Sequence, residues 1–208
     1  TCGLDVTVII DETTSITFVN GATQQVREAT TALAEAFVGT GTEMRVVEFA
    51  TTGSVATING SSGYQQVTPA YVSALTTFLQ DNYSPNGNTN WEAGIRAAIP
   101  NLANRTNVPN LVLFMTDGDP NLWNVDASGQ DGNEDSDFAL SRAVVAMREL
   151  QAIGGSLTHV IGLGVGNASN TENFGRILRL VEPGGEAIDA VGLNGTNVGT
   201  IDAVKVGA

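Results

Sequence analysis

The chain has 208 residues, a net charge of −13 at pH 7 and a single lysine, Lys205. Nucleic acids and anionic membranes attract dense positive charge, so this composition argues against both as partners. No apolar stretch approaches the length of about 18 residues that a membrane span needs, and we expect no span in this segment. The length fits one domain over residues 1–208. Because the chain starts without methionine and ends abruptly, we expect it to be excised from a longer protein.

Apolar runs at residues 4–10, 45–49, 111–115 and 157–163 predict four buried strands. Between them, residues 16–37 and 137–153 carry apolar side chains three or four positions apart, which predicts amphipathic helices. Gly39 follows the first of these helices as a natural stop. Strands that alternate with helices in this way indicate an α/β fold with a doubly wound, mostly parallel sheet.

The remaining segments complete the predicted fold. Residues 53–58 alternate in polarity close behind the second strand and predict an antiparallel edge strand. Thr68 and Pro69 suit the cap and first turn of a helix, and another helix begins near Trp91. A short strand is expected at residues 187–191, while residues 201–206 have a spacing compatible with a helix. The prediction is a six-stranded sheet with one antiparallel edge strand and helices on both faces.

Oxygen-bearing side chains follow two of the predicted strands and precede one predicted helix. They are Asp11, Thr13 and Ser15 after the first strand, Thr89 before a helix, and Asp117 after the third strand. Carboxylate and hydroxyl oxygens are the ligands that Mg²⁺, Mn²⁺ and Ca²⁺ take. Each segment alone also fits a helix N-cap. Ligand sites of open parallel sheets lie at the carboxyl ends of the strands, so the three segments together predict one divalent-cation site.

This arrangement resembles the von Willebrand factor A domain family and its metal-ion-dependent adhesion site, which combines D-x-S-x-S, a threonine and an aspartate on three loops. The resemblance implies a Rossmann-like fold in which Thr13, Ser15 and Thr89 bind the ion directly and the two carboxylates act partly through water. Thr13 stands where the family usually has serine, and threonine keeps the hydroxyl group. The implied ion is Mg²⁺ or Mn²⁺, and Ca²⁺ also fits.

The resemblance further implies a non-catalytic adhesion or recognition module, extracellular or at the cell surface. An acidic group of a protein or glycan partner would complete the coordination of the ion. Residues beside the predicted site are candidate partner contacts: Glu12, Asn90, Asp119 and Trp123. The segment from Asp117 to Asp137 carries seven acidic residues and no lysine or arginine. It either concentrates cations near the site or forms a solvated acidic loop.

Catalytic alternatives have little support in the residues. Asp11 also resembles the nucleophile of haloacid dehalogenases, but those enzymes need a second acid two positions later, where this chain has Thr13. The chain has no G-x-S-x-G turn, and its one histidine, His159, lies in an apolar strand pattern, so we expect no enzyme.

Two other functions remain open at this level: an intracellular subunit of a chelatase-type or ATP-driven assembly, and a structural domain with a vestigial metal site. Cys2, the only cysteine, either pairs outside the segment, carries a lipid or is free.

Overall fold

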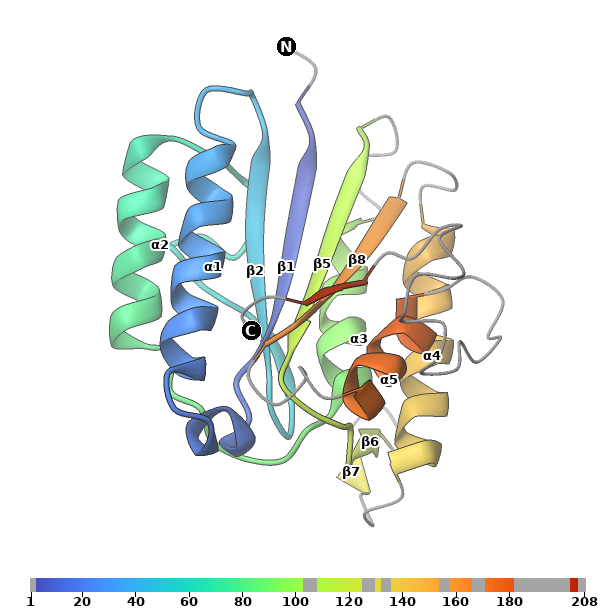
Figure 1. Ribbon diagram of the computed structural model, residues 1–208. Coiled ribbons are helices and arrows are strands. Elements are labelled where there is room, and N and C mark those ends of the chain that lie inside the picture. Colours follow the sequence, from blue (N-terminus) through green and yellow to red (C-terminus); the bar gives the residue numbers. More distant parts are fainter. Residues whose placement is uncertain are drawn as a thin grey trace.

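The computed structural model describes residues 3–102, 108–124, 130–131, 136–153, 158–165, 171–181 and 203–205 (Figure 1). A 7-stranded sheet lies at its centre, in the order β3-β2-β1-β5-β8-β9, with β4 also paired to β2. The parallel strands are β1 (Asp5–Asp11), β2 (Glu43–Phe49), β5 (Asn110–Thr116), β8 (Thr158–Gly164) and β9 (Ala203–Lys205). Two short strands, β3 (Gly53–Val55) and β4 (Gln65–Gln66), run antiparallel to β2. A separate ribbon joins β6 (Trp123–Asn124) to β7 (Gln130–Asp131).

Helices cover both faces of the sheet. The 3₁₀ helix η1 (Thr14–Phe18) leads into α1 (Ala22–Ala36), which shares one face with α2 (Pro69–Asp81). The other face carries α3 (Trp91–Leu102), α4 (Ser136–Ala152) and α5 (Thr171–Val181), as Figure 1 shows. Each face has its own apolar core. Every residue of β1 is buried, as expected for a central strand covered on both sides.

The doubly wound architecture confirms the prediction, and the four predicted strands lie within two residues of those observed. The edge strand at residues 53–58 is confirmed as β3. Thr68 caps α2 as predicted, since its side chain accepts a hydrogen bond from the Tyr71 amide. The predicted helix at residues 16–37 is divided in two, because Gly21 adopts a left-handed conformation with φ of 83° before α1 begins.

Three predicted features need correction. Among the described residues the sheet has seven strands instead of the predicted six, because it contains β4, a second antiparallel partner of β2, and β9, neither of which was predicted. Residues Ala203–Lys205, which were expected in a helix, form strand β9, since they pair in parallel with β8. Helix α5 is absent from the predicted elements, although Phe174, Ile177 and Val181 recur at helical spacing and are buried. The strand expected at residues 187–191 lies outside the described residues, as does Cys2.

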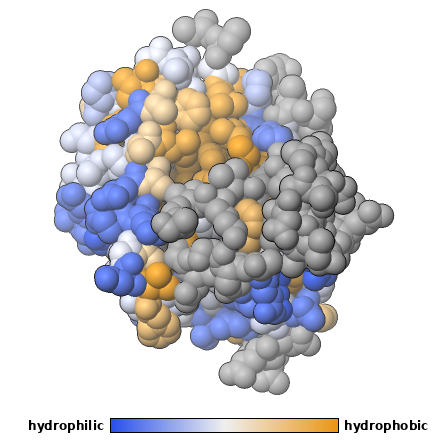
Figure 2. All heavy atoms as spheres, viewed as in Figure 1, coloured by the Kyte–Doolittle hydropathy of each residue, from blue (hydrophilic) through white to orange (hydrophobic). Residues whose placement is uncertain are grey.

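The surface of the α1 face is unevenly polar. In the view of Figure 2, hydrophilic side chains gather on the side of α1 and α2, and apolar ones gather over the upper part of the sheet. The partly buried residues of this face include Leu33 and Phe37 near the end of α1, Leu111 of β5 and Ile161 of β8.

Among the described helices, none has the length and hydropathy needed to cross a membrane.

Candidate metal centre

The candidate site lies at the edge of the sheet where the parallel strands end, at the bottom of Figure 1. Asp11 is the last residue of β1, and Asp117 follows the last residue of the neighbouring strand β5. From β1 the chain first moves to β2 on one side and later returns to β5 on the other. The strand order therefore reverses between β1 and β5, which is where open α/β sheets bind ligands.

A continuous chain of hydrogen bonds joins four of the five predicted ligands. The Thr13 amide donates to Oδ1 of Asp11 at 2.8 Å. The hydroxyls of Thr13 and Ser15 are 2.8 Å apart, and Ser15 Oγ donates to Oδ1 of Asp117 at 2.8 Å. Ser15 and Asp117 are 102 positions apart in the sequence, so the fold itself brings these oxygens together.

The fifth predicted ligand, Thr89, lies on a second loop, which packs against the loop that carries Thr13 and Ser15. Gly87 donates its amide to Oγ1 of Thr14 at 2.8 Å and accepts from the Thr14 amide, and its φ of 100° requires glycine. The Thr89 amide donates to Oδ1 of Asn121 at 2.8 Å, which ties it to the loop after β5. Within the described part of the chain, no side-chain hydrogen bond joins Thr89 to the other four ligands.

Three residues that the sequence did not single out as site residues hold Asp11 in place. Oγ1 of Thr116 donates to Oδ2 of Asp11 at 2.5 Å, and the Trp91 indole Nε1 donates to Thr116 Oγ1 at 3.2 Å. The Tyr83 hydroxyl donates to the main-chain carbonyl of Asp11. Thr116 had a sequence signal, a hydroxyl beside Asp117 at a strand end. Tyr83 had none, because it is 72 positions from Asp11.

The electrostatics of the site suit a cation. Asp11 and Asp117 are both fully buried. Burial raises the pKa of Asp11, and burial together with the negative charge of Asp11 raises the pKa of Asp117 to about 7. Oδ2 of Asp117 is buried without a hydrogen-bond partner among the described residues. An unpaired buried carboxylate oxygen beside a second carboxylate is costly unless positive charge approaches it.

The donor set also identifies the class of cation that would fit. It consists of two carboxylates and three hydroxyls, all hard oxygen ligands of the kind that Mg²⁺, Mn²⁺ and Ca²⁺ use. In the part of the chain that the structure describes, His, Cys, Asp and Glu form no group of three or more that could hold a metal. Any cation held here would therefore depend on hydroxyl ligands as much as on carboxylates.

Comparison with known proteins assigns the fold to a family. The family model for the von Willebrand factor type A domain matches residues 5–179. The chain belongs to this family. No curated protein matches the sequence at a significant level.

Solved structures share the fold of this von Willebrand factor A (VWA) domain at low sequence identity. The von Willebrand domain of a type V pili tip protein from Porphyromonas gingivalis has a TM-score of 0.68 and 11% identity, over 99% of this chain and 90% of that one. A von Willebrand factor type A protein from Catenulispora acidiphila has a TM-score of 0.61 and 15% identity, over 86% of this chain and 37% of that one. The pilus adhesin SpaC from Lactobacillus rhamnosus GG has a TM-score of 0.61 and 14% identity, over 85% of this chain and 27% of that one. This chain thus spans well under half of the last two proteins.

The four candidate partner contacts of the VWA domain occupy different environments. Asn90 is fully buried, and its amide caps α3 and binds Asn124, so the structure places it in a structural position. Glu12 is half-buried and accepts from the Ser84 amide at 2.6 Å. Asp119 is partly exposed and forms a 2.7 Å ion pair with Arg176 of α5. Trp123 is half-buried, with its ring edge-on to Phe138 at 4.8 Å.

The acidic segment is partly neutralised by an element distant in sequence. Arg176 Nη1 lies 2.7 Å from Asp119 Oδ2, and Arg176 Nη2 lies 3.8 Å from Asp137 Oδ1. These two are the first and last acidic side chains after Asp117 that the structure describes. The side chains between residues 125 and 135 lie outside the described part. At least two of the seven acids therefore face a positive charge, and the segment is not a uniformly unpaired acidic loop.

Glu48 provides a test of the electrostatics beside the site. Burial, and then the negative charge of Glu12, raise the pKa of Glu48 to about 8, and its Oε1 is buried without a hydrogen-bond partner among the described residues. The folded VWA domain thus retains a proton that the unfolded chain releases above about pH 4.5, so the free energy of unfolding falls as the pH rises from about 4.5 to 8.

We therefore expect Glu48→Gln to stabilise the protein at pH 8 and to have little effect at pH 4.5. The gain should be about 2 kcal/mol, or roughly 4–8 °C in Tm. Thermal unfolding in EDTA at both pH values checks this, with the exposed Glu35→Gln as the matched control. Equal effects of Glu48→Gln at the two pH values would contradict the assigned protonation.

Proposed function

We propose that this VWA domain is a non-catalytic recognition module, extracellular or at the cell surface, that binds its partner through a divalent cation. The cation, Mg²⁺ or Mn²⁺ with Ca²⁺ as an alternative, would be held by Asp11, Thr13, Ser15, Thr89 and Asp117. One observation carries this proposal. Two buried carboxylates and two hydroxyls, from the segments that follow β1 and β5, lie in one hydrogen-bonded group, and Asp117 has there an oxygen with no hydrogen-bond partner among the described residues.

The charges of the ligand set explain why such a site would attract an acidic partner. Asp11 and Asp117 bring two negative charges, and the remaining ligands are neutral hydroxyls. The Ser15 hydroxyl donates its one proton to Asp117, so the Thr13 hydroxyl is the donor in the contact between the two, and one lone pair of Ser15 Oγ stays free for a cation. A bound Mg²⁺ would supply the Lewis acidity that a carboxylate of a protein or glycan partner completes. A third carboxylate in place of a hydroxyl would weaken that attraction.

The comparisons support the adhesion role and the location. Among the structures that share the fold, one is a pilus adhesin and one is the tip protein of type V pili. Both are proteins of bacterial pili. A recognition role outside the cell agrees with the position of the candidate site at the edge of the sheet where the parallel strands end. At identities of 11% and 14%, these proteins support the class of function and not a particular ligand.

Cation titration of one pair of threonine variants tests the proposal. We expect calorimetry to show binding of Mg²⁺ or Mn²⁺ to the parent protein. Thr89→Ala should weaken it at least tenfold, as the loss of a group that binds or orients a metal does. The control is Thr77→Ala, which removes an exposed hydroxyl on α2, outside the candidate ligand loops, and should leave affinity unchanged.

Partner capture then links the cation to recognition. Immobilised parent protein should retain its partner from a glycan array or an extracellular-matrix extract in Mg²⁺ and release it in EDTA. Thr89→Ala should retain little in either buffer. Absence of any heat with Mg²⁺, Mn²⁺ and Ca²⁺ would rule out the cation site, and EDTA-insensitive capture would rule out its role in binding.

A further inference from the structure

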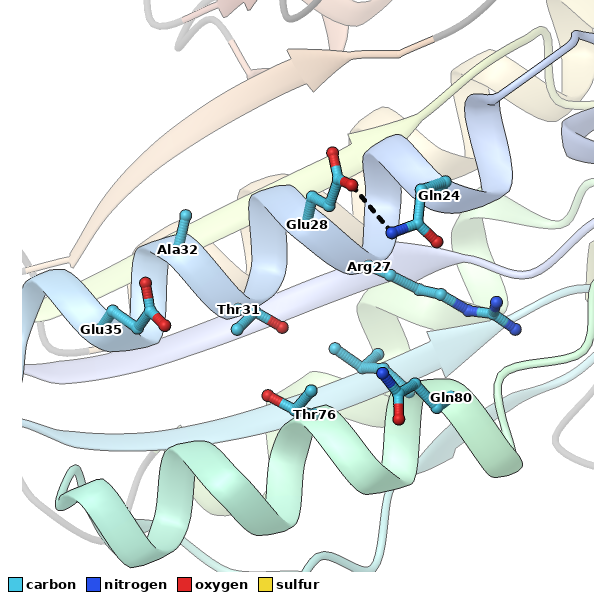
Figure 3. Close-up of a pocket in the computed structure, with 9 residues that line it drawn as sticks. Gln24, Arg27, Glu28, Thr31, Ala32, Glu35, Thr76 and Gln80 are labelled. Carbon is cyan, nitrogen blue, oxygen red and sulfur yellow. Dashed lines mark hydrogen bonds between the residues drawn. The ribbon is translucent and has the colours of Figure 1, made fainter.

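A groove lies between α1 and α2, and none of the candidate cation ligands is among the residues that line it (Figure 3). It has a volume of about 270 Å³, close to the lower end of the range for small-molecule sites. In Figure 3, Thr31 of α1 and Thr76 and Gln80 of α2 face one another across it, and Arg27 lies at one end. Seven of its nine lining residues carry hydrogen-bonding side chains, whereas the contact between two packed helices is usually apolar.

Several of these polar groups already have one partner, which fixes the role left for each. Gln24 Nε2 donates to Glu28 Oε1 at 2.8 Å, and Thr76 Oγ1 donates to the Val72 carbonyl at 2.9 Å. The oxygens of Thr76 and Gln24 and the second oxygen of Glu28 are therefore left as acceptors. Arg27 donates from Nη2 to the Tyr83 carbonyl at 3.0 Å, which fixes the guanidinium at the end of the groove as a donor.

The balance of charges and acceptors excludes most ligand classes. One arginine faces two carboxylates, Glu28 and Glu35, so phosphates and other anions are disfavoured. Glu28 and Glu35 are seven residues apart on one helix, about 10 Å along its axis, which is too far for both to bind one metal ion. Only Ala32 and Leu79 have wholly apolar side chains, so a lipid tail or aromatic ring would cover the polar ends of the other seven without giving them hydrogen-bond partners.

We propose that the α1–α2 groove binds one monosaccharide unit of a glycan, as a second recognition site independent of the candidate cation site. A sugar brings several hydroxyls that donate to the many acceptors here and also accept from Arg27 and Gln80. It carries no net charge, so the local excess of carboxylates does not repel it. A single sugar ring also suits a groove of this volume.

Chemical-shift mapping on the ¹⁵N-labelled 208-residue chain tests the proposal. The probes are the methyl glycosides of glucose, galactose, mannose and N-acetylglucosamine, with inorganic phosphate for comparison. We expect at least one glycoside to shift the side-chain amide signals of Gln24 and Gln80, with a dissociation constant on the order of 1 mM for a ligand of this size. EDTA should not alter the response, because the groove contains none of the candidate cation ligands.

Adjacent threonines on α2 give a matched pair of variants. Thr76→Val removes an acceptor in the groove at nearly constant volume and should weaken binding about tenfold, the loss expected for one hydrogen bond. Thr77→Val alters an exposed threonine beside it, outside the groove, and should bind like the parent. The proposal is overturned if no glycoside shifts these signals, if phosphate shifts them instead, or if the two variants weaken binding equally while both remain folded by circular dichroism.

Discussion

Replacing Asp117 by asparagine should stabilise the cation-free protein and at the same time remove its response to Mg²⁺. Burial and the charge of Asp11 raise the pKa of Asp117 to about 7. The folded protein therefore keeps a proton that the unfolded chain releases between about pH 4 and pH 7, and the free energy of unfolding falls as the pH rises through that window. A neutral asparagine removes this penalty. At pH 8 in EDTA we expect a gain of about 2 kcal/mol, or roughly 4–8 °C in Tm.

The Mg²⁺ response should change in the opposite direction. A ligand that binds only the folded state at about 100 times its dissociation constant adds about 2.7 kcal/mol to the parent. Asp117→Asn should show none of this gain. Calorimetric melting at pH 8 in EDTA and in Mg²⁺ gives both measurements. Asp119→Asn is the control, since Asp119 lies on the same loop but is paired with Arg176, and it should keep the Mg²⁺ response. A parent-like Mg²⁺ shift in Asp117→Asn would show that Asp117 is not a ligand.

Trp91→Ala should be strongly destabilising, with a loss of about 3–5 kcal/mol in the free energy of unfolding. Trp91 is fully buried, and its ring lies edge-on to Phe114 with centroids 5.4 Å apart. Its Nε1 also donates to Thr116, which in turn holds Asp11. The substitution therefore leaves a large cavity in the core beside the candidate site. It also removes the hydrogen bond to Thr116, the residue that holds the Asp11 carboxylate.

Urea unfolding of three variants separates these contributions. Trp91→Phe keeps most of the packing and should lose much less than Trp91→Ala, about 1 kcal/mol of it from the hydrogen bond to Thr116. Trp123→Ala, at a half-buried tryptophan on β6, should lose less than Trp91→Ala. The m-values should remain close to that of the parent, since each protein exposes similar surface on unfolding. Equal losses for Trp91→Ala and Trp123→Ala would contradict the assigned core position of Trp91.

The order of helices and strands was predictable because it depends on local patterns. A buried parallel strand needs a continuous apolar run, and a helix on a sheet needs an apolar stripe, and both are present in the sequence. Two of the errors lie where the local pattern is weak, whereas the missed helix α5 has a clear helical spacing. Strand β4 has only two residues, and β9 is a three-residue strand whose pairing with β8 decides its conformation.

The candidate ligands were predictable by type and by edge, because each follows a parallel strand or precedes a helix. The residues that hold these ligands in place were not predictable. Thr116, Tyr83 and Trp91 reach Asp11 from positions between 72 and 105 residues away or through one another, and no local pattern reports such contacts. Trp91 marks the start of a helix in the sequence, and only its burial shows that it belongs to the core.

By itself, the sequence determined a doubly wound α/β domain with a net negative charge and candidate oxygen ligands at the carboxyl edge of its sheet, since composition and periodicity are local properties. The tertiary structure alone decided which of these groups meet. It joined Ser15 to Asp117, buried Asn90 and Trp91, and brought Arg176 against Asp119 within the acidic segment. The physical reason is that hydrogen bonds, desolvation and charge pairing act over a few ångströms, and only the folded chain brings residues so distant in sequence within that range.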